Sequence, residues 1–320
     1  MPLVDMSIEE LLIYKGTSPC PADIDEYWDN AIAEMQGIDP QIILEPSEFN
    51  VPFVECYNLY FTGVKGAKIY AKYLRPKDTS KPAPAIVMLH GYSGNGGGWN
   101  DKLNYVAAGF SVFSMDCRGQ GGNSEDVGGV KGTTFRGHII RGLDDDKNKL
   151  LFRDIFLDAT QLVKIAMSMP GVDSNRVGVT GGSQQGGGLT IACAALAPEV
   201  KRIAALYPFL SDYKKVWEMD LAIDAYAELK DYFRRFDPFH KREYEIFEKL
   251  GYIDIQNIAK RIKAEVLMFT GLMDTICPPS TQFAAYNKIT SNKNVVFMPD
   301  FGHEHPYQVD DMIFEYMMGL

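Results

Sequence analysis

Residues 176–188 read RVGVTGGSQQGGG, and this stretch decides the fold. A β-branched run leads into a serine flanked by glycines, and the residues that follow, 189–196, favour a helix. This order predicts a strand, a tight turn and a helix, with the hydroxyl of Ser183 at the apex of the turn. Small neighbours are needed there because the strand and the helix must approach each other closely. Ser183 is therefore a candidate nucleophile.

The composition limits the class of protein and its partners. Of the 320 residues, 46% are hydrophobic and 23% are charged, which is typical of a folded globular chain. A formal net charge of −10 disfavours nucleic acid and anionic membranes as partners. The five cysteines have no metal-ligand spacing, so we expect free thiols in a reducing compartment. With no secretory signal and no apolar run near the roughly 18 residues of a membrane span, the sequence indicates a cytoplasmic protein.

The rest of the chain predicts an α/β architecture. Apolar runs without alternation, typical of strands buried on both faces, occur at 85–89, 111–115, 177–180, 202–206, 265–269 and 294–298. Helical stretches such as 152–169 separate them, and an antiparallel hairpin over 57–73 precedes them. We expect one domain over 1–320 with the α/β-hydrolase fold, a mostly parallel central sheet flanked by helices. An N-terminal helical arm (1–50) and a helical cap insertion (211–262) complete it.

A serine hydroxyl needs a histidine to remove its proton and a carboxylate to orient that histidine. In α/β-hydrolases these residues follow the serine in the order acid, then histidine, on loops at the carboxyl ends of strands. Asp274 and His303 each come just after one of the last two predicted strands. Asp300 is an alternative acid and His305 an alternative base. The joint placement of Asp274 and His303 favours that pair.

The negatively charged oxygen of an ester-cleavage intermediate needs N–H donors. The backbone of Gln184 is the first candidate, and Tyr92, in the loop after strand 85–89, is the second. The glycines of that loop could instead hold a phosphate. However, neither G-x-x-x-x-G-K-S/T nor G-x-G-x-x-G, the two glycine patterns typical of phosphate-binding loops, is present. The triplet Asp144-Asp145-Asp146 could be read as a metal site, although carboxylates beside a helix N-terminus are common.

Further residues are candidates for supporting or lining the site. Arg118, in Arg118-Gly119-Gln120 after strand 111–115, could bind a carboxylate with two hydrogen bonds and hold the loops of the site. Tyr92, together with Trp99, Tyr207 and Pro208, could form the wall of a small acyl pocket, although aromatic residues more often belong to the core.

Arg118-Gly119-Gln120, Gly181-Gly182-Ser183-Gln184, Asp274 and His303-Glu304 together resemble the signature of carbohydrate esterase family seven, the acetyl xylan esterases and cephalosporin C deacetylases. The resemblance covers nearly the whole chain. It implies catalysis by Ser183, Asp274 and His303, an oxyanion hole at Tyr92 and Gln184, and support of the site by Arg118, Gln120 and Glu304. It also implies removal of acetyl groups from short xylo-oligosaccharides and cephalosporins through an acetyl-serine, without metal or other cofactor, by an intracellular hexamer.

One position departs from the pattern. Gln185 stands where G-x-S-x-G places a glycine, and family members usually carry a single Gln at this turn, so the chain has one extra residue. Two alternatives stay open: a serine hydrolase of another class, such as a prolyl-oligopeptidase-type peptidase, and a catalytically silenced hydrolase fold. We expect the arm (1–50) and the hairpin (57–73) to bury apolar surface between subunits of a homo-oligomer.

Overall fold

The computed structural model describes residues 4–78 and 80–320, apart from the side chains of 183–185. A nine-stranded sheet crosses the molecule in the order β1-β2-β3-β5-β4-β6-β7-β8-β9. In chain order the strands are β1 (Ile43–Pro46), β2 (Val54–Thr62), β3 (Lys68–Pro76), β4 (Ala83–Leu89), β5 (Ser111–Met115), β6 (Val172–Gly181), β7 (Arg202–Leu206), β8 (Glu265–Gly271) and β9 (Lys293–Met298). The pairings from β1 to β5 are antiparallel, and those from β5 to β9 are parallel. The predicted α/β-hydrolase fold is confirmed.

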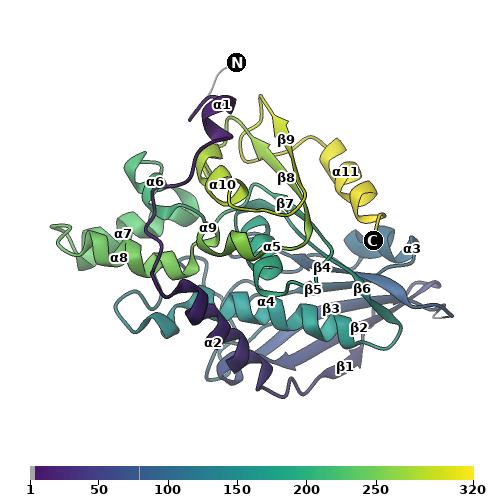
Figure 1. Ribbon diagram of the computed structural model, residues 1–320. Helices are drawn as coiled ribbons and strands as arrows, with labels where there is room; N and C mark the ends of the chain where they lie inside the picture. The colour runs from purple at the N-terminus through teal and green to yellow at the C-terminus, as the bar shows by residue number, and fades with distance from the viewer. Residues whose placement is uncertain (1–3, 79) are drawn as a thin grey trace.

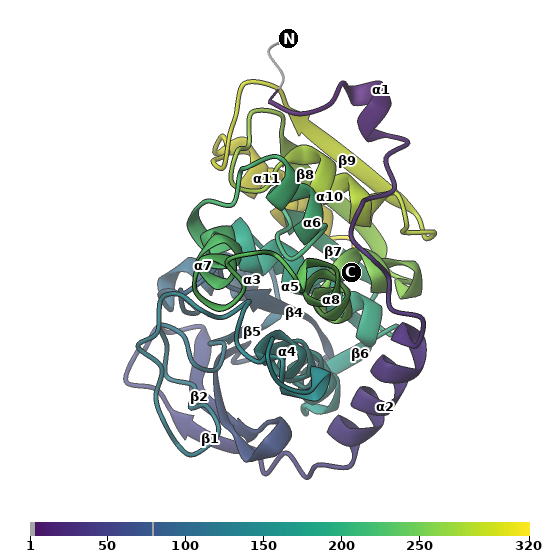
Figure 2. The ribbon, with the colours of Figure 1, turned by 90° about the vertical axis from the view of Figure 1, so that its left-hand side faces the viewer.

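Helices cover both faces of the sheet, with α4 and α5 on one side and α3 and α11 on the other (Figures 1 and 2). The α-helices are α1 (Ile8–Leu11), α2 (Ile24–Gln36), α3 (Leu103–Ala107), α4 (Leu151–Ser168), α5 (Ser183–Leu196), α6 (Tyr213–Glu218), α7 (Ala227–Phe236), α8 (Glu243–Leu250), α9 (Ile255–Ile258), α10 (Pro279–Tyr286) and α11 (Gln308–Met317). Six short 3-10 turns lie between the helices and strands of the described residues: η1 (Val64–Gly66), η2 (Asn100–Lys102), η3 (Lys147–Lys149), η4 (Asp224–Tyr226), η5 (Gly251–Ile253) and η6 (Ala259–Arg261).

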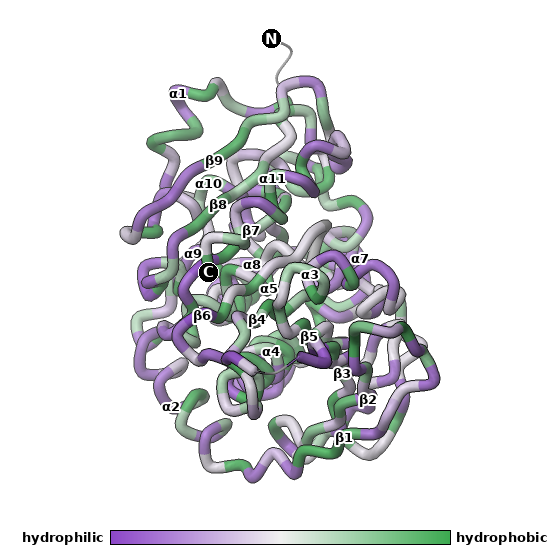
Figure 3. The backbone as a smooth tube through the Cα atoms, turned by 90° about the vertical axis from the view of Figure 1, so that its right-hand side faces the viewer, coloured by the Kyte–Doolittle hydropathy of each residue, from purple (hydrophilic) through white to green (hydrophobic). Residues whose placement is uncertain are grey.

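The continuous apolar runs of the sequence are the central strands. β5 is buried at all five positions, because helices exclude water from both faces of the sheet. Figure 3 shows the hydrophobic segments gathered along β4, α4 and α5 at the centre of the molecule. The edge strand β1, which the sequence analysis missed, is only four residues long and exposed throughout. Among the described residues, no helix has the length and apolar character needed to cross a membrane.

The N-terminal arm packs against its own chain. Trp28 of α2 is fully buried, stacks on Phe156 of α4 with ring centroids 5.6 Å apart, and donates its indole N–H to the Tyr252 carbonyl. Nearer the N-terminus, the Asp212 carboxylate accepts hydrogen bonds from three arm residues, Tyr14, Thr17 and Ser18. The arm thereby joins α4 to the segment between β7 and β8. Burial of arm residues between subunits stays a prediction.

The junction of β6 and α5 depends on two glycines. A Cβ on Gly181 would lie 2.4 Å from the Gly186 carbonyl oxygen, and a Cβ on Gly186 would lie 2.4 Å from the Leu89 carbonyl oxygen. No side chain fits at either position. Because α5 begins at Ser183, the two glutamines fall in its first turn. Gly186 is then the residue at which the helix comes closest to the backbone of β4. The glycine that the turn requires is thus present, one residue later than in G-x-S-x-G.

This contact predicts that Gly186→Ala destabilises the protein by about 1–3 kcal/mol or more, because the added methyl group overlaps the backbone of β4. Urea unfolding of the variant and the wild type measures the loss. Gly37→Ala is the matched control, since Gly37 has a φ of −76° and a Cβ there would meet only ordinary contacts, the nearest at 3.5 Å. Equal stability of Gly186→Ala and the wild type would contradict the close approach.

Candidate active site

The loops after β8 and β9 bring Asp274 and His303 together. Oδ2 of Asp274 lies 2.9 Å from Nδ1 of His303. Oδ1 accepts the backbone N–H groups of Ile276 and Cys277, each at 2.8 Å, so both oxygens of this fully buried carboxylate have partners. A carboxylate can only accept, which assigns the proton on His303 to Nδ1. Nε2 is then the nitrogen that can take a proton from a nucleophile.

The two alternative residues have other partners. Nδ1 of His305 lies 2.5 Å from the Tyr207 hydroxyl, and its Nε2 lies 3.3 Å from a carboxylate oxygen of Asp310. Asp300 is exposed in the turn directly after β9. The geometry therefore favours Asp274 and His303 as the acid and the base.

Ser183 and Gln184 are the first two residues of α5, and their side chains lie outside the described part of the structure. Their position follows from the topology. β6, β7, β8 and β9 are neighbouring parallel strands, so the start of α5 and the loops of Asp274 and His303 lie at the same edge of the sheet. In the first turn of a helix, backbone N–H groups have no acceptor within the helix. The backbone N–H of Gln184 is therefore a donor that the helix itself does not use, and its oxyanion role stays a prediction.

The loop after β4 is fastened by Gln120. The side-chain oxygen of this fully buried residue accepts the Ser93 N–H at 2.9 Å. Ser93 is the neighbour of Tyr92, whose hydroxyl accepts the His138 N–H at 3.3 Å. Tyr92 is therefore held through its side chain and through the backbone next to it.

His90 adds a second link between the loops after β4 and β5. Its Nε2 accepts the Cys117 N–H at 2.9 Å, so its proton resides on Nδ1, which lies 2.6 Å from the Gly91 carbonyl oxygen. Burial lowers the pKa of the His90 imidazole, which favours the neutral ring that this arrangement needs. Both contacts fix the backbone that precedes Tyr92.

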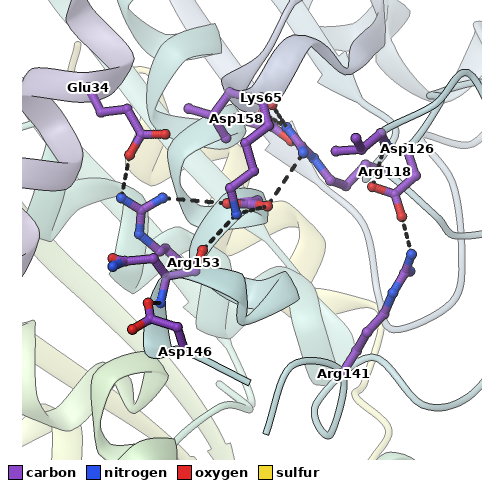
Figure 4. Close-up of polar contacts among 12 residues, drawn as sticks. Glu34, Lys65, Arg118, Asp126, Arg141, Asp146, Arg153 and Asp158 are labelled. Carbon is purple, nitrogen blue, oxygen red and sulfur yellow. Dashed lines mark hydrogen bonds and ion pairs between the residues drawn. The ribbon is translucent and has the colours of Figure 1, made fainter. Parts of the chain in front are cut away.

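Arg118 binds a carboxylate of its own chain. Its Nε and Nη2 each lie 2.6 Å from an oxygen of Asp158 on α4, and Nη2 also donates to the Val64 carbonyl at 3.0 Å. Asp154, one turn earlier on α4, lies beside the guanidinium and pairs with Lys65 at 2.9 Å. Figure 4 shows Lys65 of η1, Arg118 of the loop after β5 and Asp158 of α4 converging. The expected two-bond contact is present, and it ties the Arg118-Gly119-Gln120 loop to the core.

Glu304 and the predicted pocket residues occupy different surroundings. Glu304 accepts the Gly302 N–H at 3.2 Å and so shapes the loop of the candidate base. The Tyr207 ring lies 4.8 Å from the His303 ring, and Pro208 is buried beside α5. Trp99 stacks on Phe49 with centroids 6.2 Å apart, which makes it a packing residue of the sheet's antiparallel side.

A cleft of about 420 Å³ lies beside Tyr92. It is lined by Tyr92, Ser93, Phe135, Arg136, Asp224 and Ala225. Asp224 and Ala225 belong to η4, so the predicted cap segment forms one wall. Glu228 of α7 joins the same segment to the chain that follows Arg136 by accepting the Ile139 N–H at 2.8 Å, and burial raises the pKa of the Glu228 carboxyl to about 7. Tyr92 lines this cleft as predicted, whereas Phe135, Arg136, Asp224 and Ala225 belong to no motif and were not predicted from the sequence.

The acidic triplet 144–146 makes contacts within the chain. Asp144 accepts hydrogen bonds from Tyr232 and Arg242. Among the described residues, the one group of three potential metal ligands is Asp274, Cys277 and His303. Burial raises the pKa of the Cys277 thiol well above its ordinary value, which favours S–H over the thiolate that binds metal. This group fits a hydrogen-bonded pair better than a metal site.

Comparisons with known proteins identify the family to which the chain belongs. Residues 1–320 match the family model described as acetyl xylan esterase (AXE1). The chain belongs to the acetyl xylan esterase family. The resemblance to carbohydrate esterase family seven is thereby confirmed, and with it the class of carboxylic ester hydrolases.

Known members of the acetyl xylan esterase family resemble the chain over most of its length. Acetyl xylan esterase 1 from Thermoanaerobacterium sp. JW/SL YS485 is 59% identical and superposes with a TM-score of 0.95 over 98% of this chain and 99% of that one. The acetyl xylan esterase from Paenibacillus sp. R4 is 32% identical, with a TM-score of 0.91 over 98% and 99%. Acetyl esterase Axe7A of Xylanibacter ruminicola is 26% identical over 285 residues, or 87% of this chain, which spans 62% of that relative's length.

The Arg118–Asp158 contact predicts that Arg118→Lys destabilises the protein by about 3–5 kcal/mol, because an ammonium group cannot replace both hydrogen bonds and Asp158 stays buried. Urea unfolding followed by tryptophan fluorescence measures the change. Arg242→Lys, at an ion pair with Asp144 on the surface, is the control and should cost less than about 1 kcal/mol. If the two variants lost similar free energies of unfolding, the Arg118–Asp158 pair would contribute no more to stability than a surface ion pair.

Proposed function

We propose that this member of the acetyl xylan esterase family removes acetyl groups from acetylated xylo-oligosaccharides and related small esters, including cephalosporin C, through an acetyl-serine intermediate. The observation that carries the proposal is the hydrogen bond between Asp274 and His303 at the edge of the sheet where α5 begins. Asp274 orients the imidazole, and Ser183 is the nucleophile that such a pair serves.

In the acylation step, Ser183 Oγ attacks the acetyl carbonyl carbon while Nε2 of His303 takes the hydroxyl proton. The backbone N–H groups of Tyr92 and Gln184 stabilise the oxygen that becomes negative. The intermediate then expels the sugar alcohol, which receives the proton from His303. The buried carboxylate of Asp274 stabilises the imidazolium while it exists.

In the deacylation step, water takes the place of the alcohol. His303 removes a proton from the water, whose oxygen attacks the acetyl carbonyl carbon. The same N–H groups bind the oxyanion, and acetate leaves as Ser183 recovers its proton. Every proton transfer passes through one imidazole, so neither a metal nor a cofactor is needed.

The cleft beside Tyr92 supports a small substrate. Its volume of about 420 Å³ is at the lower end of the range for ligand pockets. Phe135 gives it an apolar side chain, and Arg136 and Asp224 add polar groups that can bind sugar hydroxyls.

The proposal predicts hydrolysis of p-nitrophenyl acetate, acetylated xylotriose and cephalosporin C. Cleavage of p-nitrophenyl butyrate should be slower than cleavage of p-nitrophenyl acetate. Ser183→Ala and His303→Ala should each lower kcat by about 10³-fold or more, since the remaining residues cannot activate the nucleophile. Steady-state assays with an aminoacyl arylamide as a further substrate separate the alternatives. Amide cleavage without deacetylation would favour a peptidase. Failure of a fluorophosphonate to label Ser183 in folded protein would favour a silenced hydrolase fold.

We also propose that the protein is a cytoplasmic homo-oligomer, in the hexameric form that the family resemblance implies. None of the five cysteines, all of them described, forms a disulfide. Apolar side chains are exposed on the arm and along β1, with Ile13 75% and Ile43 50% accessible. The outer edge of β1 also offers backbone groups that another chain could pair with.

This arrangement predicts that light scattering at micromolar concentration gives a mass several times that of the 35.8 kDa chain. Ile43→Lys should reduce the mass, because a charge on an edge strand opposes pairing. Lys65→Arg, away from that edge on η1, serves as the control. A monomeric wild type would contradict the proposal.

A further inference from the structure

Tyr207 is held in an unusual conformation next to the candidate base. It follows β7 directly, and its φ of 39° lies in the left-handed region that residues with a side chain rarely adopt. Its backbone N–H donates to the Phe269 carbonyl of β8 at 3.0 Å, and the residue is only 2% exposed. Backbone strain of this kind persists only where the surroundings fix it, and it is frequent in functional sites.

The side chain of Tyr207 lies beside two histidines of one loop. Its ring centroid is 4.8 Å from that of His303 and 6.0 Å from that of His305. Its hydroxyl lies 2.5 Å from Nδ1 of His305. His303 and His305 are two residues apart, so a bond that fixes His305 also limits the movement of His303. The end of β7 is thereby tied to the loop after β9.

The direction of this hydrogen bond follows from the charges around it. Burial raises the pKa of the Tyr207 phenol, and the negative charge of Asp274 adds to the rise. The phenol therefore keeps its proton and donates it, so Nδ1 of His305 is the acceptor. The proton of His305 then resides on Nε2, which lies 3.3 Å from Oδ1 of Asp310. Tyr207 and His305 thus share one hydrogen bond, and Asp310 lies near the other ring nitrogen of His305.

We propose that Tyr207 and His305 are positioning residues for His303 and constitute a second anchor beside Asp274. The inference rests on the proposed function, because it treats His303 as the general base. Asp274 holds Nδ1 of that imidazole, and the Tyr207 ring lies beside the imidazole with the two ring centroids 4.8 Å apart. The Tyr207 ring supplies a surface against which the imidazole rests, and the hydrogen bond to His305 holds that surface in place.

The anchor also bears on the charged state of the base. During acylation His303 becomes an imidazolium, and an aromatic ring within about 6 Å of a cation attracts it. Small displacements of a catalytic group are costly, since misplacement by about 1 Å can slow a reaction about 100-fold. Loss of the anchor should therefore affect kcat, whereas KM should change little.

The test uses two substitutions at His305 that introduce the same amide group at different distances from the backbone. Asn places its amide oxygen near the position of Nδ1, whereas Gln extends toward the position of Nε2. We expect His305→Asn to keep kcat for p-nitrophenyl acetate within about threefold of the wild type, and His305→Gln to lower it about tenfold. Tyr207→Phe should match His305→Gln, with KM unchanged within about twofold, and the double variant Tyr207→Phe/His305→Gln should be no slower than either alone.

Tyr213→Phe is the matched control, because it removes the hydroxyl of another buried tyrosine, one that donates to the Ile253 carbonyl. Its kcat should equal that of the wild type, and melting temperatures show that every variant is folded. Three results would overturn the inference. They are an equal kcat for His305→Asn and His305→Gln, a double variant about 100-fold slower than the wild type, and a rise in KM without a fall in kcat.

The outcomes for the proposed function remain separate. If Ser183→Ala and His303→Ala keep their activity, the proposed function fails. If those two variants lose activity while Tyr207→Phe and His305→Gln keep the wild-type kcat, only the positioning role fails.

Discussion

A salt bridge closed to solvent, between Arg118 and Asp158, links the core of the molecule to its candidate site. Removing both charges from water is costly, and two short hydrogen bonds with good geometry offset that cost. The pair fixes the loop after β5 against α4. Two residues further on, Gln120 accepts a hydrogen bond from the Ser93 N–H and so fixes the backbone next to Tyr92. The position of the Tyr92 backbone, which we propose as an oxyanion donor, thus depends on an ion pair that is closed to solvent.

The topology of the sheet supplies the second constraint. Parallel strands present their carboxyl ends at one edge, so the start of α5 and the loops of Asp274 and His303 meet there although they are far apart in the sequence. The close approach of β6, α5 and β4 leaves no room for side chains at Gly181 and Gly186. The extra glutamine is accommodated because the second glycine still lies against β4, inside the first turns of the helix.

Much of this arrangement could be predicted from sequence, for physical reasons that differ between elements. The central strands follow from apolar runs, because burial on both faces leaves no place for polar residues. β1 was missed since its residues are exposed and no burial pattern marks it. The candidate acid and base could be placed by their order after the last strands, which favoured His303 over His305, and the hydrogen bond to Asp274 agrees with that choice.

Strand burial and short motifs are local features, so the architecture, the family and the candidate catalytic residues could be inferred from the chain alone. What surrounds those residues depends on tertiary packing. The walls of the cleft come from η4 and the 135–136 loop, which no motif connects. Tyr207 meets both histidines because β7 ends beside the loop after β9. Such contacts depend on how distant segments pack, and a reading of the chain in order does not contain that information.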